Sequence, residues 1–283
     1  MRWMIRVATL AVLVAAPLAA ALAQTDGQPT PWGIGFQPAA SPVKAQIHWF
    51  HNDLLMPIIT VITIFVLGLL VYVMWRFSAA RNPNPSRVTH NTTVEILWTV
   101  IPIVILVVIA IPSFRLLYYE DRAVDPEFTV KATGKQWYWT YDYPDQGGFG
   151  FDSYMVQKAD LKPGQPWLLE VDNRMVVPVG ATVRVIVAGN DVMHSFFIPA
   201  LGVQIYAVPG RLNETWFKVD REGVFYGQCN QICGVNHAFM PIAVQAVPRA
   251  EFGKWVEEAK KKFAAGEPVP APSPTALAAA EIR

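Results

Sequence analysis

Two long apolar runs near the N-terminus are the strongest pattern in the sequence. Residues 54–75 and residues 96–114 each contain no charged side chain. As α-helices, these runs would be about 33 Å and about 28 Å long, close to the thickness of a bilayer core. The pattern predicts a transmembrane α-helical hairpin within residues 51–118, with helices at about 54–77 and 95–117. Buried helices in the core of a soluble protein are the alternative.

The segments around the hairpin predict its orientation. The loop between the two runs contains Arg81 and Arg87 but no acidic residue, so it is expected to be cytoplasmic. Residues 1–23 combine a basic start, a short apolar core and a small-x-small site, which predicts a cleaved signal peptide. An uncleaved anchor is the alternative. Residues 24–50 then form an extracytoplasmic N-terminal arm, and the domain after residue 118 lies on the same side.

From residue 119 to residue 248 the pattern changes to short β-prone runs separated by Pro and Gly turn signals. This spacing favours an all-β domain, an antiparallel sandwich or a Greek-key barrel. Residues 249–263 have apolar positions at helical spacing and predict an amphipathic helix. Residues 264–283 are rich in Pro and Ala and are expected to be disordered. The predicted strands are 128–132, 136–141, 166–171, 182–188, 214–219, 224–227 and 242–246.

Composition and charge restrict the class of protein. Hydrophobic residues make up 53% of the chain and charged residues only 16%, which supports membrane segments. The formal net charge is +1, so no basic excess argues for a nucleic-acid partner. Residues 119–250 contain 14 acidic and 11 basic residues, a mild negative excess.

Candidate metal chemistry is concentrated in one short stretch. The two cysteines of the chain, Cys229 and Cys233, are followed by His237 and Met240, and His194 lies upstream. Thiolates, imidazoles and a thioether are donors that suit copper rather than calcium or magnesium. Four interpretations are open: a disulfide, a zinc site of two Cys and two His, a blue-copper site that leaves Cys229 unused, and a two-copper site with both thiolates bridging.

Four motifs in order make a family resemblance specific. Residues 226–241 (YGQCNQICGVNHAFMP) resemble the copper A loop of cytochrome c oxidase subunit II. Residues 134–141 (GKQWYWTY) resemble its aromatic segment, and residues 191–195 (DVMHS) its first-histidine motif. Residues 207–213 (AVPGRLN) are similar to the turn between that motif and the copper loop. The resemblance covers roughly residues 36–248.

The resemblance implies a cupredoxin-like domain, periplasmic and spanning residues 119–248, that holds a binuclear copper A centre. Cys229 and Cys233 would bridge the two coppers. His194 and His237 would bind one copper each, and Met240 would be a weak axial ligand.

Gln231 is the position that departs from the family pattern. Its backbone carbonyl would bind copper, because this ligand does not depend on the side chain. The family commonly has Glu here, and the carboxylate helps to bind magnesium at the contact with subunit I. An amide oxygen is a poorer ligand for that hard cation, so weaker or altered magnesium binding is expected.

The resemblance also implies residues for electron and proton transfer. Trp137 would receive the electron from cytochrome c, with Tyr138 in the docking surface, although ordinary strand packing also explains the run of aromatic residues. Glu95 would be the proton uptake carboxylate, although an acid at a helix start is also a favourable partner of the helix dipole. Acidic side chains would steer a basic cytochrome c towards the domain. The candidate docking acids are Asp142, Asp145, Asp152, Asp172 and Asp191.

The function implied is that of subunit II of an aerobic respiratory cytochrome c oxidase in a bacterial inner membrane. Electrons would pass from cytochrome c through copper A to haem a of subunit I, where oxygen is reduced to water and protons are pumped. Subunit III is a further expected partner. The chain carries no Cys-x-x-Cys-His haem attachment motif, so the enzyme activity would belong to the complex. A metal-free structural subunit, as in quinol oxidases, and a copper carrier or storage protein are the alternatives.

Overall fold

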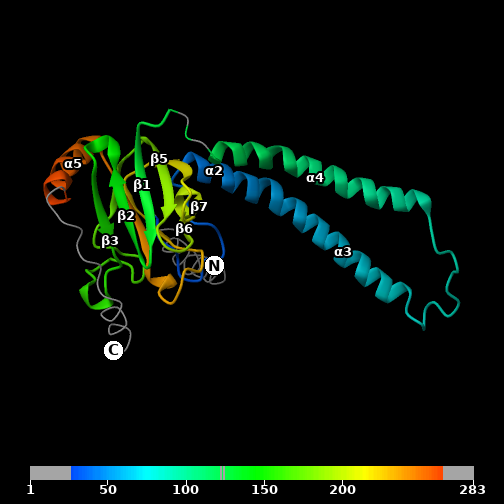
Figure 1. Ribbon diagram of the computed structural model, residues 1–283. Coiled ribbons are helices and arrows are strands. Elements are labelled where there is room, and N and C mark those ends of the chain that lie inside the picture. The colour runs from blue at the N-terminus through cyan, green and yellow to red at the C-terminus, as the bar shows by residue number, and fades with distance from the viewer. Residues whose placement is uncertain (1–26, 122, 124, 264–283) are drawn as a thin grey trace, which may run out of the picture. The chain divides into compact units, whose positions relative to one another are not determined.

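The computed structural model describes residues 27–121, 123 and 125–263 (Figure 1). The expected signal peptide and C-terminal tail lie outside the described residues. The chain forms two compact units. The first contains residues 43–121, and the second combines residues 27–42 with the described residues after 122.

The first unit consists of two long apolar helical segments. α2 (Pro42–His48), the π-helical η1 (Trp49–Leu55) and α3 (Met56–Arg76) follow one another without a break, and α4 spans Thr92–Asp121. The combined segment Pro42–Arg76 and α4 are each long and apolar enough to span a membrane. Most of their large apolar side chains are exposed, as a lipid-facing surface requires.

Both helical segments are longer than the hydrophobic pattern predicts. Residues 42–50, which were expected to belong to the N-terminal arm, are helical. No Gly follows Pro42 until Gly68, and proline at a first helical position is compatible with the helix. The helix therefore begins before the apolar run, in a segment that contains polar residues. A search for uncharged runs does not detect this part of the helix.

The second unit contains two five-stranded sheets. The first sheet contains, in spatial order, β3 (Phe149–Ser153), β2 (Tyr138–Tyr143), β1 (Phe128–Lys135), β5 (Thr182–Gly189) and β8 (Asn213–Lys218). The second contains β4 (Met175–Pro178), β10 (Pro241–Val247), β9 (Gly223–Gln228), β6 (His194–Ile198) and β7 (Val203–Ala207). The helical hairpin followed by a β-sandwich confirms the predicted fold class.

The sheets are not wholly antiparallel, so of the two expected arrangements the purely antiparallel sandwich was wrong. β1 pairs with β5 in parallel, and β10 pairs with β4 in parallel. Turn signals between neighbouring segments predict antiparallel hairpins only for strands that follow one another. In each parallel pair, the two strands are separated by several other strands along the chain. The intervening segments allow the two strands to run in the same direction.

One predicted strand does not form. Residues 166–171 make turns, in which the N–H groups of Leu169 and Glu170 donate to the carbonyl of Pro166, and Leu168 has a φ of 70°. The apolar side chains that suggested a strand, Leu169 and Val171, are buried in a small cluster with Tyr226 of β9. β3, β4, β6 and β7 lie outside the predicted set.

The hydrophobic core lies between the sheets and continues beneath a C-terminal helix. Along β1, β2 and β3, buried residues that face the core alternate with partly exposed residues. α5 spans Arg249–Phe263, the range expected for the amphipathic helix, and lies beside β3 (Figure 1). It adds Phe252, Val256 and Ala259 to the same core.

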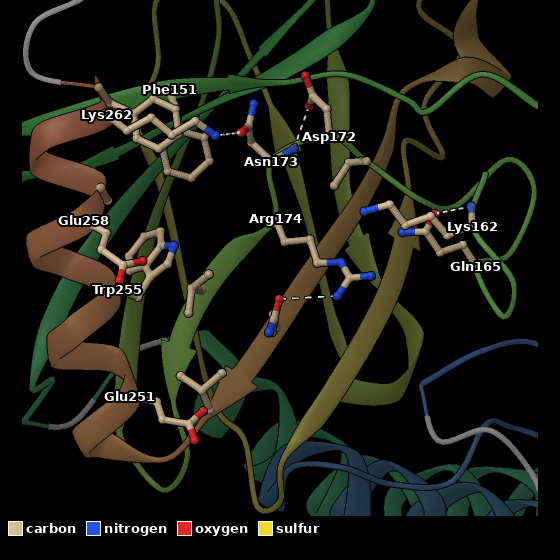
Figure 2. A pocket seen from close by; sticks show the side chains of 16 residues that line it. Phe151, Lys162, Gln165, Asp172, Asn173, Arg174, Glu251, Trp255, Glu258 and Lys262 are labelled. Carbon is tan, nitrogen blue, oxygen red and sulfur yellow. Dashed lines mark hydrogen bonds between the residues drawn. The ribbon is translucent and has the colours of Figure 1, made fainter. Parts of the chain in front are cut away.

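A cavity of about 580 Å³ lies beside α5 (Figure 2). Lys262 bonds to Asn173 at 3.0 Å, and Arg174 reaches Gln245 at 3.3 Å. The charged side chains that line the cavity are Lys162, Arg174, Lys262, Asp172, Glu251 and Glu258. Within the described residues, the cavity is lined by none of the predicted metal donors.

The N-terminal arm packs on the β-sandwich. The carbonyl of Gly27 accepts a hydrogen bond of 2.9 Å from the N–H of Tyr226 in β9. Ala40 and Ser41 are fully buried, and the N–H of Ala40 donates to the carbonyl of Ala200 at 2.9 Å. Part of the expected arm is therefore an ordered component of the second unit.

Candidate metal centre

The predicted donors gather at one end of the second sheet. His194 is the first residue of β6, Cys229 follows the last residue of β9, and Met240 precedes β10. Cys233 and His237 lie in the loop between β9 and β10, with His237 at the start of a single 3-10 turn. β6 and β9 are antiparallel neighbours with Phe197 opposite Gln228, so the residues of β6 before Phe197 run past the end of β9 beside the loop that follows it.

Short distances connect these donors. The ligand atoms of His194, Cys229 and Cys233 all lie within 4.8 Å of one another. The two Sγ atoms are 3.9 Å apart, and both cysteines are free thiols. The Sγ of Cys233 is 3.5 Å from Nδ1 of His237 and 3.5 Å from Sδ of Met240. The structure therefore brings all five predicted side chains into one group.

Gln231 contributes its backbone to this group. Its carbonyl oxygen lies 3.3 Å from the Sγ of Cys229, so the carbonyl points towards the donors. The neighbouring side chains of Ile232 and Val235 are 81% and 84% exposed. The loop thus presents polar donors inward and an apolar tip outward.

The orientation of His194 fits a metal ligand. Its side chain is fully buried, and Nε2 lies 2.9 Å from Oδ1 of Asp191. The other ring nitrogen, Nδ1, is buried and has no hydrogen-bond partner within the described part of the chain. A buried nitrogen without a partner costs free energy unless it binds another group, and a metal ion would satisfy it. The donor set and this nitrogen together fit copper.

The pKa values of the three closest donor side chains shift in different directions. Burial raises the pKa of the Cys229 thiol, but the nearby imidazole of His194 and neighbouring backbone groups together outweigh burial and lower that pKa on balance. Burial and the charge of Cys229 raise the pKa of Cys233. Burial lowers the pKa of His194, whereas Cys229 and Asp191 raise it above its ordinary value on balance. Metal binding would release these protons, because only thiolates and neutral imidazoles are ligands.

Two tryptophans hold the backbone of the ligand loop. Trp137 is half-buried, and its Nε1 donates to the carbonyl of Cys233 at 3.3 Å. Trp139 is fully buried, and its Nε1 donates to the carbonyl of Met240 at 3.3 Å. The Nε2 of Gln136 also donates to the Cys233 carbonyl, at 2.9 Å. The aromatic segment is thus joined to the metal loop by three side-chain hydrogen bonds.

Close approaches at two glycines complete the site. A Cβ atom at Gly134 would lie 2.9 Å from the ring of His194. A Cβ atom at Gly234 would lie 2.9 Å from the ring of Trp137. The sequence alone did not predict the close approaches at the two glycines or the hydrogen bonds of Gln136 and Trp139. Their positions within the family motifs were the only signal in the sequence.

Strand packing accounts for most of the aromatic run. Trp139, Tyr141 and Tyr143 alternate along β2 and are fully buried. Tyr138 points to the other face and stacks on Tyr154, with ring centroids 4.4 Å apart. Of the residues in this run, Trp137 and Tyr138 therefore retain partial access to a partner.

The candidate docking acids all have partners within the second unit. The partners are Lys131 for Asp142, Thr129 for Asp145, Thr140 and Lys135 for Asp152, Tyr154 for Asp172, and His194 and Gln136 for Asp191. The Asp142 side chain keeps 43% exposure, whereas that of Asp152 keeps 19%. The acids are therefore unequal in their access to a docking protein, and their role in steering stays a prediction.

Glu95 lies in the first turn of α4. Its Oε1 accepts a hydrogen bond of 3.0 Å from the N–H of Asn91, and Oδ1 of Asn91 accepts one of 3.2 Å from Val94. This reciprocal pair caps the start of the helix, as the simpler interpretation of this acid requires. Proton uptake at Glu95 stays a prediction.

Comparison with known proteins gives consistent matches. A model of the cytochrome c oxidase subunit II periplasmic domain matches residues 128–247, and a model of the transmembrane domain of the same subunit matches residues 29–116. A probable cytochrome c oxidase subunit 2 of Rickettsia bellii is 51% identical over 85% of this chain and 89% of the relative. Cytochrome c oxidase subunit 2 of Arabidopsis thaliana is 52% identical over 80% of this chain and 89% of the relative. The crystal structure of the periplasmic domain of subunit II of a Bradyrhizobium japonicum cytochrome oxidase is 58% identical, with a TM-score of 0.47, and covers 50% of this chain and 99% of that one.

Proposed function

Because this chain belongs to the cytochrome c oxidase subunit II family, we propose that it accepts electrons from cytochrome c at a copper A centre and passes them to haem a of subunit I. Family membership makes it a membrane-anchored subunit of a haem-copper oxidase, an oxidoreductase complex, with a periplasmic domain.

The observation that carries the proposal is the convergence of soft donors on the unpartnered Nδ1 of His194. The thiolates of Cys229 and Cys233 would hold the two copper ions. His194 and His237 would bind one copper each, through the nitrogens that face the thiols. When bound, the copper pair would supply a store for one electron shared between the metals.

Two further groups complete the proposed ligand set. The Sδ of Met240 lies 3.5 Å from the Sγ of Cys233, and this thioether would be a further ligand to one copper. The carbonyl of Gln231 lies at the Sγ of Cys229 and would serve the other. The amide side chain of Gln231 would give subunit I a weaker magnesium contact than a carboxylate would.

Trp137 is the proposed electron acceptor because its indole bonds directly to the backbone of a copper ligand, Cys233. Its half-buried ring would contact cytochrome c, with Tyr138 and nearby acids in the docking surface. The electron would then leave for haem a of subunit I, where oxygen is reduced to water and protons are pumped.

The remaining proposals concern the complex and the membrane. Subunit III would be a further partner, and the complex would lie in the bacterial inner membrane. The arm and the β-sandwich would share the periplasmic side, so Glu95 at the start of α4 would lie near the cytoplasmic surface. There it would feed protons to the catalytic subunit, since acids at this depth commonly mark proton paths.

Electron paramagnetic resonance on the assembled oxidase tests the copper assignment. The expected result is one unpaired electron shared over two coppers, with two coppers bound per chain. Met240→Leu should alter the reduction potential of the centre, whereas Met193→Leu should not, because Met193 is 46% exposed. A single-copper pattern would instead support a blue site, and a silent spectrum would support a disulfide or zinc.

A further inference from the structure

The carboxylate of Asp191 joins three groups at the metal centre. Oδ1 accepts a hydrogen bond from the N–H of Val192 at 2.7 Å and lies 2.9 Å from Nε2 of His194. Oδ2 accepts one from the N–H of Gln136 at 2.7 Å. Asp191 lies in the turn between β5 and β6, and its side chain is 30% exposed. It is therefore an internal hydrogen-bond acceptor as well as a surface charge.

The contact with His194 selects the ring tautomer. A carboxylate accepts but cannot donate, so Nε2 must carry the proton. The lone pair is then on Nδ1, which is the buried nitrogen without a partner in the described part of the chain. A carboxylate on the far nitrogen also makes the imidazole a stronger donor to a metal. Gly134 provides the space in which the ring keeps this orientation.

The contact with Gln136 connects the same carboxylate to the aromatic segment. Gln136 precedes Trp137, and the side chains of both residues donate to the carbonyl of Cys233. A continuous chain of bonds therefore runs from His194 through Asp191 and Gln136 to Cys233. It joins a histidine ligand, a cysteine ligand and the indole that lies beside them.

We propose that Asp191 is a positioning residue that fixes the His194 tautomer and holds Trp137 in register with the copper ligands. This inference rests on the proposed copper centre and deepens it. Asp191 was one of five acids expected to steer cytochrome c, but its three internal hydrogen bonds assign it a role that a freely exposed acid would not have. Loss of the carboxylate would weaken the donation of His194 to the metal, which disfavours the oxidised centre and raises the reduction potential.

Asp191→Asn is the direct test, in the full-length chain loaded with copper in detergent. An amide has one acceptor oxygen and one donor nitrogen, so it cannot accept from both His194 and Gln136. Chelator competition should show copper affinity lower by about 10- to 100-fold, the usual effect of losing an outer partner of a metal ligand. The reduction potential should rise, and the paramagnetic resonance spectrum should change.

Asp142→Asn is the matched control, because it removes the same charge from a side chain that is 43% exposed and paired with Lys131. Its copper affinity, potential and spectrum should equal those of the wild type. Asp191→Glu keeps the charge but moves the carboxylate by one methylene, and its affinity should lie between those of the wild type and Asp191→Asn. This second variant carries the test if Asp191→Asn does not fold.

Wild-type affinity and potential in either folded Asp191 variant would overturn the inference and leave Asp191 as a docking acid. Absence of a two-copper signal from the wild-type chain itself would overturn the proposed centre, and the inference with it. The two failures are distinguishable, because the first requires an intact wild-type signal.

Discussion

The phenol of Tyr226 donates a hydrogen bond of 2.8 Å to the fully buried carboxylate of Glu170. Arg174 bonds to the same carboxylate through Nε at 2.8 Å and Nη2 at 2.6 Å. Tyr226 lies in β9, three positions before Cys229. The network therefore attaches the long loop before β4 to the strand that leads into the metal centre.

Glu170→Gln should destabilise the protein by about 3 kcal/mol, the lower end for breaking a buried ion pair, because Arg174 keeps 24% exposure. Burial raises the pKa of Glu170, but Arg174 and Tyr226 outweigh burial and lower the pKa below its ordinary value of 4.5. Its contribution to stability is thus present above pH 4.5 and is lost as the pH falls through the folded-state pKa.

The measurement is chemical unfolding of the full-length chain in detergent at neutral and acidic pH. The difference between wild type and Glu170→Gln should be largest at neutral pH and should shrink in acid. Glu214→Gln is the control, because its ion pair with Arg184 is more exposed and is worth about 1 kcal/mol or less. Equal losses in both variants, or a difference that grows in acid, would contradict this account.

Replacement of Trp137 should slow electron transfer from cytochrome c without removing copper. Trp137→Phe deletes the hydrogen bond to Cys233 and should cost about 0.5–1.5 kcal/mol of stability. Trp137→Ala also deletes the ring and should slow electron transfer further. Stopped-flow reduction by cytochrome c measures the rate, with Trp167→Phe, at a 39% exposed tryptophan, as the control. Unchanged turnover in Trp137→Ala would refute its role as electron acceptor.

Gly134→Ala should disturb the metal centre, because its Cβ would lie 2.9 Å from the His194 ring. Overpacking of this kind costs about 1–3 kcal/mol, and displacement of the ring should lower copper affinity. Gly253→Ala is the matched control, since its Cβ would meet nothing within 4 Å in helix α5. It should stabilise the protein by roughly 0.8–1.0 kcal/mol. Copper titration and thermal unfolding of both variants give the comparison.

Gln231→Glu should strengthen magnesium binding in the assembled oxidase while copper is retained. A carboxylate is a better ligand than an amide for a hard cation, whereas the proposed copper ligand is the backbone carbonyl. Elemental analysis after treatment with a chelator compares the magnesium retained by the two forms. Full, tightly held magnesium in the wild-type oxidase would show that the amide is no handicap.

Salt should weaken the docking of cytochrome c if the acids of the β-sandwich steer it. Screening shortens electrostatic attraction between exposed charges to about 8 Å at physiological ionic strength. Among the candidate acids, Asp142 should contribute more than Asp152, because its side chain is more exposed. Turnover as a function of ionic strength for both Asp→Asn variants tests this order. A flat dependence in the wild type would rule out steering.

Local patterns in the sequence account for much of this architecture. The two uncharged runs predict the membrane helices, because side chains that face lipid must be apolar. This requirement does not depend on which segments the helix packs against. Apolar positions at helical spacing predict α5. Motif order identifies the metal loop, since Cys229, Cys233, His237 and Met240 lie within twelve positions of one another.

Contacts between distant segments are what the tertiary structure decided. The parallel pairing of β1 with β5 and the turns at residues 166–171 depend on neighbours that no local period encodes. Asp191 reaches Gln136 across 55 positions, and Gln136 reaches Cys233 across 97. A sequence shows that an acid and a glutamine are present, but a hydrogen bond forms only where folding brings donor and acceptor within about 3 Å. The donors of the metal centre are thus evident in the sequence, whereas the groups that orient them become visible only in the fold.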